Sequence, residues 1–171
     1  HGEAATHDFL EEIPASLRFE IVSACYSPLL RSLPLFSSAD NILIGAIASK
    51  LVPYLFMPDE VIIREGMVGM SMYFIQRGQV RIIKDYHTRR ERFVGVLQHG
   101  TDSSFFGEIA ITSRGGQRRK SSVLSNTVLT LQRLARSSLE EVGRSHPTIL
   151  PLIEKVANAR LDELGEEADM E

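Results

Sequence analysis

The sequence lacks the features that mark several large classes of protein. Its single cysteine, Cys25, excludes an internal disulfide and fits a reducing cytosol. No run of 18 apolar residues occurs, so no segment is long enough to span a bilayer. The net charge of −3 gives no reason to expect a nucleic acid or an anionic membrane surface as a partner, because neither would be attracted.

A metal-binding pattern is also missing, so we expect no metal site. The histidines show no ligand spacing and no nearby cluster of cysteines or carboxylates. The first residues, His1-Gly2-Glu3, lack the basic and apolar segments of a signal peptide. We expect the chain to be a soluble piece of a longer protein. At 171 residues and 43% hydrophobic, it can bury the core of one domain with a helical appendage.

The first part of the chain, residues 6–39, has the composition of short helices. Pro14 suits the first turn of a helix. Pro28 and Pro34 should interrupt further helix, because proline lacks the backbone N–H that an interior position donates. Asp40 is a candidate N-cap for a next helix over residues 42–51, whose apolar residues recur at helical spacing.

The middle of the chain, residues 53–134, consists of short apolar runs separated by turn signals. Such closely spaced runs with glycine-bearing turns predict an antiparallel sandwich or barrel. Arg77-Gly78 lies between two runs and predicts a hairpin. The runs are Val61–Ile63, Met72–Ile75, Val80–Ile83, Phe93–Leu97, Val123-Leu124 and Val128–Leu131.

Helical spacing returns at the C-terminal end. Ser137 or Ser138 should cap one helix, and an apolar stripe from Ile149 to Leu164 predicts another. Gly165 should stop this helix, leaving residues 166–171 as an acidic tail. The fold class is therefore α+β: an antiparallel β-roll or jelly-roll barrel flanked by N-terminal helices and C-terminal helices.

One segment carries a set of groups that suits a sugar phosphate. Gly107 permits close backbone approach just before the carboxylate of Glu108, and Arg119 follows eleven residues later. An arginine can bind phosphate oxygens, while a carboxylate facing the sugar can accept hydrogen bonds from hydroxyl groups. Without a family resemblance, Phe106-Gly107-Glu108 could equally be an aromatic residue, a turn glycine and an exposed acid that form no binding site.

The order of motifs resembles one family. Phe106-Gly107-Glu108 followed by Arg119 resembles the phosphate-binding cassette of cyclic-nucleotide-binding domains. Further stretches are similar to the versions in hyperpolarisation-activated (HCN) and cyclic-nucleotide-gated (CNG) channels, and HCN looks closer. These stretches are Ser32–Phe36 with Ala39-Asp40, Pro58-Asp59, Ile62–Gly66, Gly69, Met72–Gln76 with Gly78, and Ala159–Asp162 with Leu164-Gly165.

The resemblance implies a division of the chain. Residues 1–36 would be the end of the channel's C-linker, and residues 37–165 the cyclic-nucleotide-binding domain. Within that domain the β-roll would cover about 53–134 and a lid helix about 148–165, followed by the acidic tail.

The resemblance also implies a role for each site residue. Glu108 would hold the ribose 2′-hydroxyl, Arg119 would pair with the cyclic phosphate, and the purine would meet the barrel and the lid helix. The ligand-binding residues implied in this way are Phe106, Gly107, Glu108, Ile109, Ala110, Arg119, Lys120, Ser121, Val96, Leu97, Arg160 and Leu164.

Two departures from the family pattern bear on the ligand. Lys120 follows Arg119 where the family has threonine or serine, and a threonine hydroxyl there favours the guanine of cGMP. We therefore expect cAMP, with cGMP as the alternative. The loop through Gly115-Gly116-Gln117 is also two residues longer than usual.

The implied function is that of a sensor. We expect the cytoplasmic ligand-sensing domain of an HCN/CNG-like cation channel, in which nucleotide binding closes a loosely held lid helix and biases the pore. Partners would be the cyclic nucleotide, the remainder of the channel and its sister subunits in a tetramer, at the cytoplasmic face of the plasma membrane. We expect no enzymatic activity.

Several alternatives compete with this interpretation. A channel domain of the same fold that has lost nucleotide binding would act as a structural gate. A cupin-like enzyme would need histidines on barrel strands, and a bacterial regulator would need a helix-turn-helix after the lid. Arg118–Ser121 also fits a basophilic kinase site. The basic run 84–92 is interpreted as a solvated hairpin tip, with contact to a lipid or partner as the minority view.

Overall fold

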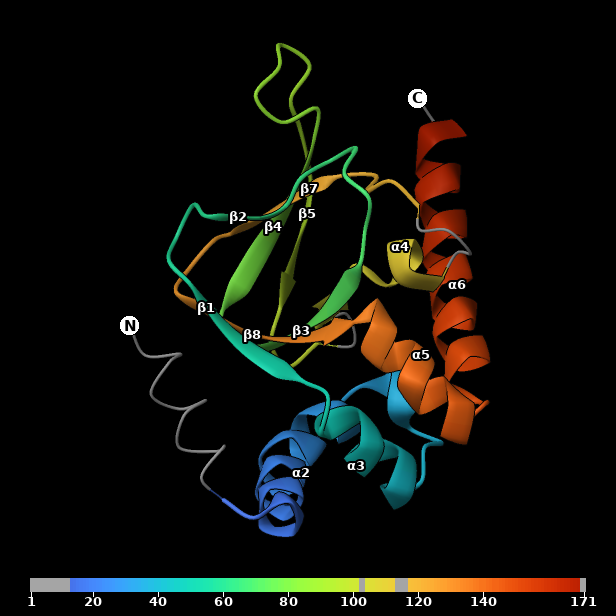
Figure 1. The fold of residues 1–171 in the computed structure, drawn as a ribbon. Helices are drawn as coiled ribbons and strands as arrows, with labels where there is room; N and C mark the ends of the chain where they lie inside the picture. Colours follow the sequence, from blue (N-terminus) through green and yellow to red (C-terminus); the bar gives the residue numbers. More distant parts are fainter. Residues whose placement is uncertain (1–12, 102–103, 113–116, 170–171) are drawn as a thin grey trace.

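The computed structural model describes residues 13–101, 104–112 and 117–169, and over residues 161–169 it describes the path of the helix without the side chains. Two antiparallel sheets stand beside a group of helices that covers one end of the molecule (Figure 1). This arrangement confirms the predicted α+β class, with helices on both sides of the strands in the sequence. Within these ranges no helix combines the length and apolar character that a bilayer crossing requires.

The chain enters through helices α2 (Ala15–Arg31), η1 (Pro34–Phe36) and α3 (Asn41–Ala48). Pro14 is the N-cap of α2, one residue before the first turn in which the sequence predicts it. The carboxylate of Asp40 accepts a hydrogen bond of 2.8 Å from the backbone N–H of Leu43 and so caps α3. Asp40 is therefore confirmed as an N-cap.

The prediction that Pro28 interrupts the helix is wrong, because α2 continues to Arg31. A proline removes the hydrogen bond to the carbonyl four residues earlier, here Ala24. Both Ala24 and Pro28 are exposed, so water can reach this part of the helix. Beyond the proline, Leu29 and Leu30 are buried, and this apolar burial stabilises the last turn.

The strands form two four-stranded sheets with the orders β1-β8-β3-β6 and β2-β7-β4-β5, and every pairing within them is antiparallel. The first sheet packs against the helices, while the second lies farther from them and faces the first across the interior of the roll (Figure 1). The strands are β1 (Val52–Phe56), β2 (Val61–Ile63), β3 (Ser71–Arg77), β4 (Gln79–Lys84), β5 (Arg92–Gln98), β6 (Phe105–Phe106), β7 (Ser122–Ser125) and β8 (Leu129–Ala135).

The turn at Arg77-Gly78 is not a hairpin, which corrects the prediction. β3 and β4 flank it but lie in different sheets, so the turn carries the chain from one sheet to the other. Gly78 has a φ of 93°, and a Cβ at this position would lie 2.5 Å from the carbonyl oxygen of Val128. Both the backbone conformation and the space therefore require glycine here.

Two strands were not expected from the sequence. β1 contains Pro53, which is tolerated because β1 is an edge strand that pairs only with β8. β6 is two residues long and pairs with β3 through Phe105 and Phe106. A strand of two residues is too short to show the alternation of apolar and polar residues by which strands are predicted from sequence.

The C-terminal helices are α5 (Arg136–Ser145) and α6 (Ile149–Asp169), with α4 (Glu108–Thr112) between the strands. The N-cap of α5 is Ala135, not Ser137 or Ser138. The prediction that Gly165 ends the last helix is also wrong, since α6 runs four residues further. A glycine inside a helix costs only about 1 kcal/mol relative to alanine, so it does not by itself end one.

Two apolar cores share the first sheet. One joins the helices to that sheet and includes Phe36, Met72 and Phe74. The other fills the roll between the two sheets and includes Ile75 and Phe106. Phe74 and Ile75 are neighbours on β3, so alternate residues of this strand enter different cores. The helices and the roll are consequently packed on opposite faces of one strand.

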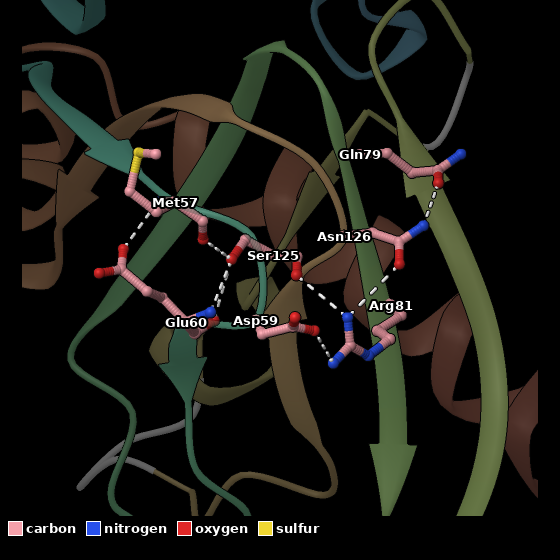
Figure 2. Close-up of polar contacts among 7 residues, drawn as sticks. All are labelled: Met57, Asp59, Glu60, Gln79, Arg81, Ser125 and Asn126. Carbon is pink, nitrogen blue, oxygen red and sulfur yellow. Dashed lines mark hydrogen bonds and ion pairs between the residues drawn. The ribbon is translucent and has the colours of Figure 1, made fainter.

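A polar cluster closes one end of the second sheet, where β4 begins and β7 ends (Figure 2). The hydroxyl of Ser125 donates to the carbonyl of Met57 and accepts from the N–H of Glu60 at 2.9 Å. Arg81 bonds the carboxylate of Asp59 at 2.7 Å and the carbonyl of Ser125 at 3.2 Å. These bonds fix the turn between β1 and β2 to the sheet, so this end of the roll is tied together by side chains.

Candidate functional site

A cavity of about 330 Å³ opens between the second sheet and helices α4 and α6. It brings together eleven of the twelve predicted ligand-binding residues. The twelfth, Leu164, lies on α6 where the side chains are outside the described part of the structure. The eleven are Phe106, Gly107, Glu108, Ile109, Ala110, Arg119, Lys120, Ser121, Val96, Leu97 and Arg160.

Six further residues line the cavity without having been predicted. Most are apolar residues of the second sheet, and they form its wall. Their signal in the sequence is the alternation of strand residues, which becomes informative only once the inward face of each strand is known. They are Ile63, Ile82, Val94, Gly95, Arg118 and Val123.

Gly107 sets the close approach of α4 to the first sheet. Its φ is 89°, which glycine adopts without steric cost. A Cβ at this position would lie 3.0 Å from the carbonyl oxygen of Ser71 and 2.8 Å from Nη1 of Arg119. A side chain here would therefore push apart the strand, the helix and the arginine.

Glu108 opens α4 and is only 1% exposed. Its Oε1 accepts a hydrogen bond of 2.8 Å from Nη1 of Arg160. Its Oε2 is buried and has no hydrogen-bond partner among the described residues. Because an unpaired buried carboxylate oxygen is costly, this atom marks a place where an external donor would be stabilised.

Arg119 enters the site from the other side, and part of its guanidinium is used by the backbone. Nη1 donates to the carbonyl of Gly107 at 2.9 Å, and Nη2 donates to the carbonyl of Ser71 at 2.5 Å. Burial lowers the pKa of Arg119 below its ordinary value, and the charges of Tyr73 and Glu108 oppose that shift. The other three N–H groups of the guanidinium have no acceptor among the described residues.

The glycine at position 69 makes room for this arginine. A Cβ there would lie 2.2 Å from Cβ of Ala110 and 2.6 Å from Cζ of Arg119. The backbone of Arg119 is held as well, because its N–H donates to the carbonyl of Met67 at 2.8 Å. The guanidinium is therefore positioned from both its backbone and its side chain.

Arg160 connects α6 to this site through three contacts. Besides Glu108, its Nη1 donates to the carbonyl of Phe105 at 3.0 Å. Its guanidinium carbon lies 4.1 Å from the centroid of the Phe105 ring, in cation–π geometry. The sequence resemblance places Arg160 against a base, and the structure adds an ion pair with Glu108 that sequence reasoning did not anticipate.

The remaining predicted residues differ in exposure, since Phe106 and Ala110 are buried while others in the lining are open to solvent. Lys120 is exposed, Ser121 is half-buried, and the side chain of Val96 is 42% exposed. Their neighbour Ser122 is buried and accepts a hydrogen bond of 3.0 Å from the N–H of Glu65, which fixes the start of β7. Within the described ranges no group of three or more metal-ligating side chains occurs.

The cavity thus combines an apolar wall, a buried acceptor and a guanidinium. These groups complement a molecule with a flat apolar part, a hydroxyl group and a negative charge. Glycines at positions 69 and 107 allow the two charged side chains to approach the same space.

Comparisons with known proteins agree on one family. Residues 55–146 match the model of the cyclic nucleotide-binding domain family. The chain is 37% identical over 156 residues to potassium/sodium hyperpolarization-activated cyclic nucleotide-gated channel 2 of Mus musculus, which covers 91% of this chain. It is 37% identical over 158 residues to channel 1 of Oryctolagus cuniculus, covering 92%. The chain spans 17% of the length of these relatives.

A solved structure shows the same fold. The regulatory domain of Toxoplasma gondii PKA, co-crystallised with cAMP, superposes with a TM-score of 0.71 at 21% identity. The match covers 89% of this chain and 55% of that one.

Proposed function

This chain belongs to the family of cyclic nucleotide-binding domains, and we propose that its cavity binds a cyclic purine nucleotide, with cAMP as the expected ligand and cGMP as the alternative. The observation that carries the proposal is the buried Oε2 of Glu108, which has no hydrogen-bond partner among the described residues. This oxygen would be stabilised by a hydrogen-bond donor from a ligand. A ribose hydroxyl supplies that donor.

The three parts of the ligand would meet three parts of the cavity. The cyclic phosphate pairs with the guanidinium of Arg119, and the ribose hydroxyl bonds Oε2 of Glu108. The purine lies against Val96 and Leu97 on β5, where the wall is apolar. Arg160 lines the cavity from α6, and the resemblance implies that Leu164 would join it in covering the purine. Lys120 replaces the hydroxyl that favours guanine, which supports adenine.

The same site offers a route from ligand to helix. Glu108 presents one oxygen to Arg160 on α6 and the other to the proposed ribose hydroxyl. A ligand that fixes Glu108 therefore also fixes the anchor of α6, and the population of the docked helix rises. The domain acts by binding and coupling, and no catalytic step is assigned to it.

The wider role follows from the relatives and is part of the proposal. We place the domain in an HCN/CNG-like cation channel, at the cytoplasmic face of the plasma membrane, with sister subunits forming a tetramer. Residues 1–36, whose described part includes α2 and η1, would be the end of a C-linker that transmits the movement of α6 to the pore. The described helices contact one another in one core, which makes such transmission direct.

A calorimetric titration with cAMP and cGMP tests the binding. We expect binding of cAMP, and a loss of about 10- to 100-fold in affinity for Arg119→Ala, because charge-assisted hydrogen bonds contribute about 1.5–3 kcal/mol. Glu108→Gln should weaken binding as well. Arg144→Ala, an exposed arginine on α5, is the control and should bind as the wild type does. Unchanged affinity in a folded Arg119→Ala protein would remove phosphate pairing.

One observation favours a second candidate, a structural gate without ligand. Arg160 already bonds Glu108, and backbone carbonyls already accept from Arg119, so the charged groups have partners within the protein. This alternative predicts no heat with either nucleotide in protein that is folded by circular dichroism. The titration therefore separates the two candidates.

A further inference from the structure

The chain carries a concentration of positive charge that its net charge conceals. The net charge of the chain is −3, yet among the described residues seven cationic side chains and three carboxylates gather at one end of the second sheet. At this end β2 and β4 finish while β5 and β7 begin. We call it the basic edge. Its cations are Arg64, Lys84, Arg89, Arg90, Arg92, Arg118 and Lys120, and its acids are Glu65, Asp85 and Glu91.

Two of the carboxylates are engaged by the backbone of the hairpin. Glu65 accepts a hydrogen bond of 2.8 Å from the N–H of Asp85, and Glu91 accepts one of 2.9 Å from the N–H of His87. They hold the turn in shape. Arg89 and Arg90 are exposed, and neither forms an ion pair with a carboxylate in the described part of the chain.

The geometry of the edge keeps like charges together. Lys84 and Arg92 are register partners at the ends of β4 and β5, so their side chains leave the same face of the sheet. Like charges directly opposite one another destabilise a strand pair. Beyond them, Asp85 and His87 have φ values of 53° and 64°, which side-chain-bearing residues rarely adopt. The hairpin is therefore a turn that keeps cationic side chains near one another.

The basic edge leads into the cavity. Arg118 and Lys120 belong to both the edge and the cavity lining, and Arg92 stands two residues before Val94 in the cavity wall. Figure 1 shows the hairpin between β4 and β5 projecting beyond the body of the molecule, at the end away from α2. An anion that approaches from this side meets positive potential before it reaches Arg119.

We propose that the basic edge steers the anionic ligand into the cavity and so raises its association rate. This inference rests on the proposed function, since it concerns how the same ligand arrives. The net charge of the whole chain repels a negative molecule, and the cationic side chains described on the basic edge oppose this repulsion on the approach to the cavity. Such steering acts on association and leaves dissociation unchanged, because the distant charges do not touch the bound ligand.

Ionic strength gives the proposal a sharp signature. The screening length is about 30 Å at 0.01 M salt and about 3 Å at 1 M. At low salt the charges of the hairpin tip therefore attract an anion that is near the cavity entrance. At high salt this attraction is screened. We expect the association rate of the wild type to fall as salt rises, while the dissociation rate stays constant.

The test is stopped-flow binding of a fluorescent cAMP analogue to the Arg89→Glu, Arg90→Glu double variant. Both residues are exposed and neither lines the cavity. We expect the association rate at about 10 mM ionic strength to fall about three- to tenfold, with an unchanged dissociation rate. The difference should vanish at about 0.5 M. The pair Arg89→Gln, Arg90→Gln should lie between wild type and the glutamate variant.

A matched control changes the net charge equally at the other end of the molecule. Arg31→Glu with Arg144→Glu alters the ends of α2 and α5, far from the hairpin tip (Figure 1), and should change the association rate less than twofold. Equal slowing in both double variants would overturn local steering, as would an unchanged rate or a change in dissociation alone. A wild type that binds no nucleotide overturns the proposed function and this inference together. One that binds normally while the tip variant keeps its rate overturns this inference alone.

Discussion

At the scale of single residues, the site depends on how little space separates its parts. Gly107 allows the first turn of α4 to lie against β3, and this places the carboxylate of Glu108 in a buried position. The same closeness lets the carbonyl of Gly107 accept a hydrogen bond from Arg119. The acid and the guanidinium are thus held by neighbouring backbone atoms, and the spacing between them is set by a residue without a side chain.

Substitution of this glycine should damage both stability and binding. In Gly107→Ala the new methyl group meets the carbonyl of Ser71 and the guanidinium of Arg119, and the φ of 89° is unfavourable for alanine. We expect a loss of about 1–3 kcal/mol in the free energy of unfolding, measured by urea titration, together with weaker cAMP binding.

Gly95→Ala is the matched control for stability. A Cβ at Gly95 meets nothing within 4 Å, and its φ lies outside the left-handed region. Its unfolding free energy should stay within about 0.5 kcal/mol of the wild type. Equal stability of the two variants would show that the close approach at Gly107 is not required.

At the scale of elements, one arginine joins the middle of α6 to the roll. Arg160 joins the helix to α4 through Glu108 and to β6 through the carbonyl and ring of Phe105. Ahead of it, Ile153 and Ala157 are buried, so the first half of α6 is held by apolar packing. The ion pair is consequently the last described contact that fixes the helix to the roll.

Removal of that contact should loosen the helix locally. In Arg160→Ala the carboxylate of Glu108 loses its only described hydrogen-bond donor while remaining buried. We expect faster amide hydrogen exchange in α6 around position 160, and a loss of about 1–3 kcal/mol in stability. Adding Glu108→Gln to this variant should restore part of the loss, because it removes the stranded charge.

Lys155→Ala provides the comparison on the same helix. Lys155 is exposed and makes no ion pair within the described ranges, so amide exchange in α6 should remain that of the wild type. Unchanged exchange in Arg160→Ala would mean that α6 is held by its apolar face alone.

The elements differ in how far the sequence alone predicts them. The cap at Asp40 and the longer strands carry local signals, a side-chain oxygen before a helix and runs of β-branched and aromatic residues. The sheet change at Gly78 carries none, because a glycine turn is compatible with a hairpin and with a crossing between sheets. The predicted helix break at Pro28 does not occur, because burial of Leu29 and Leu30 outweighs the loss of one backbone hydrogen bond.

The site shows the same division. Most residues of the site could be predicted from the sequence, because Gly107, Glu108 and Arg119 lie in one short segment that resembles a known motif. The ion pair between Glu108 and Arg160 joins residues 52 positions apart. Its formation depends on the packing of α6 against α4, and no local pattern encodes that packing.

At the scale of the whole molecule, the two cores make the domain a single cooperative unit. They meet on β3, where Phe74 enters the helical core and Ile75 enters the roll. Loss of either core leaves one face of this strand exposed. We therefore expect a single unfolding transition that includes both the helices and the sheets.

Ligand binding should shift this transition as one event. At a cAMP concentration of 100 times the dissociation constant, mass action adds about 2.7 kcal/mol to the stability. For a domain of this size the melting temperature should rise by about 5–10 °C, as measured by calorimetry. The uncharged nucleoside adenosine at the same concentration is the control and should cause a much smaller rise. A melting temperature that nucleotide leaves unchanged would contradict the proposed binding.

The two-residue strand β6 has a consequence for how such a domain can change over time. Its consecutive rings face opposite ways: Phe105 belongs to the helical core, and Phe106 belongs to the roll and lies 5.2 Å from the ring of Tyr73. A mutation that enlarges or shrinks the floor of the cavity at Phe106 displaces the backbone that carries Phe105. Adaptation to a ligand of another shape would thus demand compensating substitutions among the helices, so the two halves of the domain are constrained to evolve jointly.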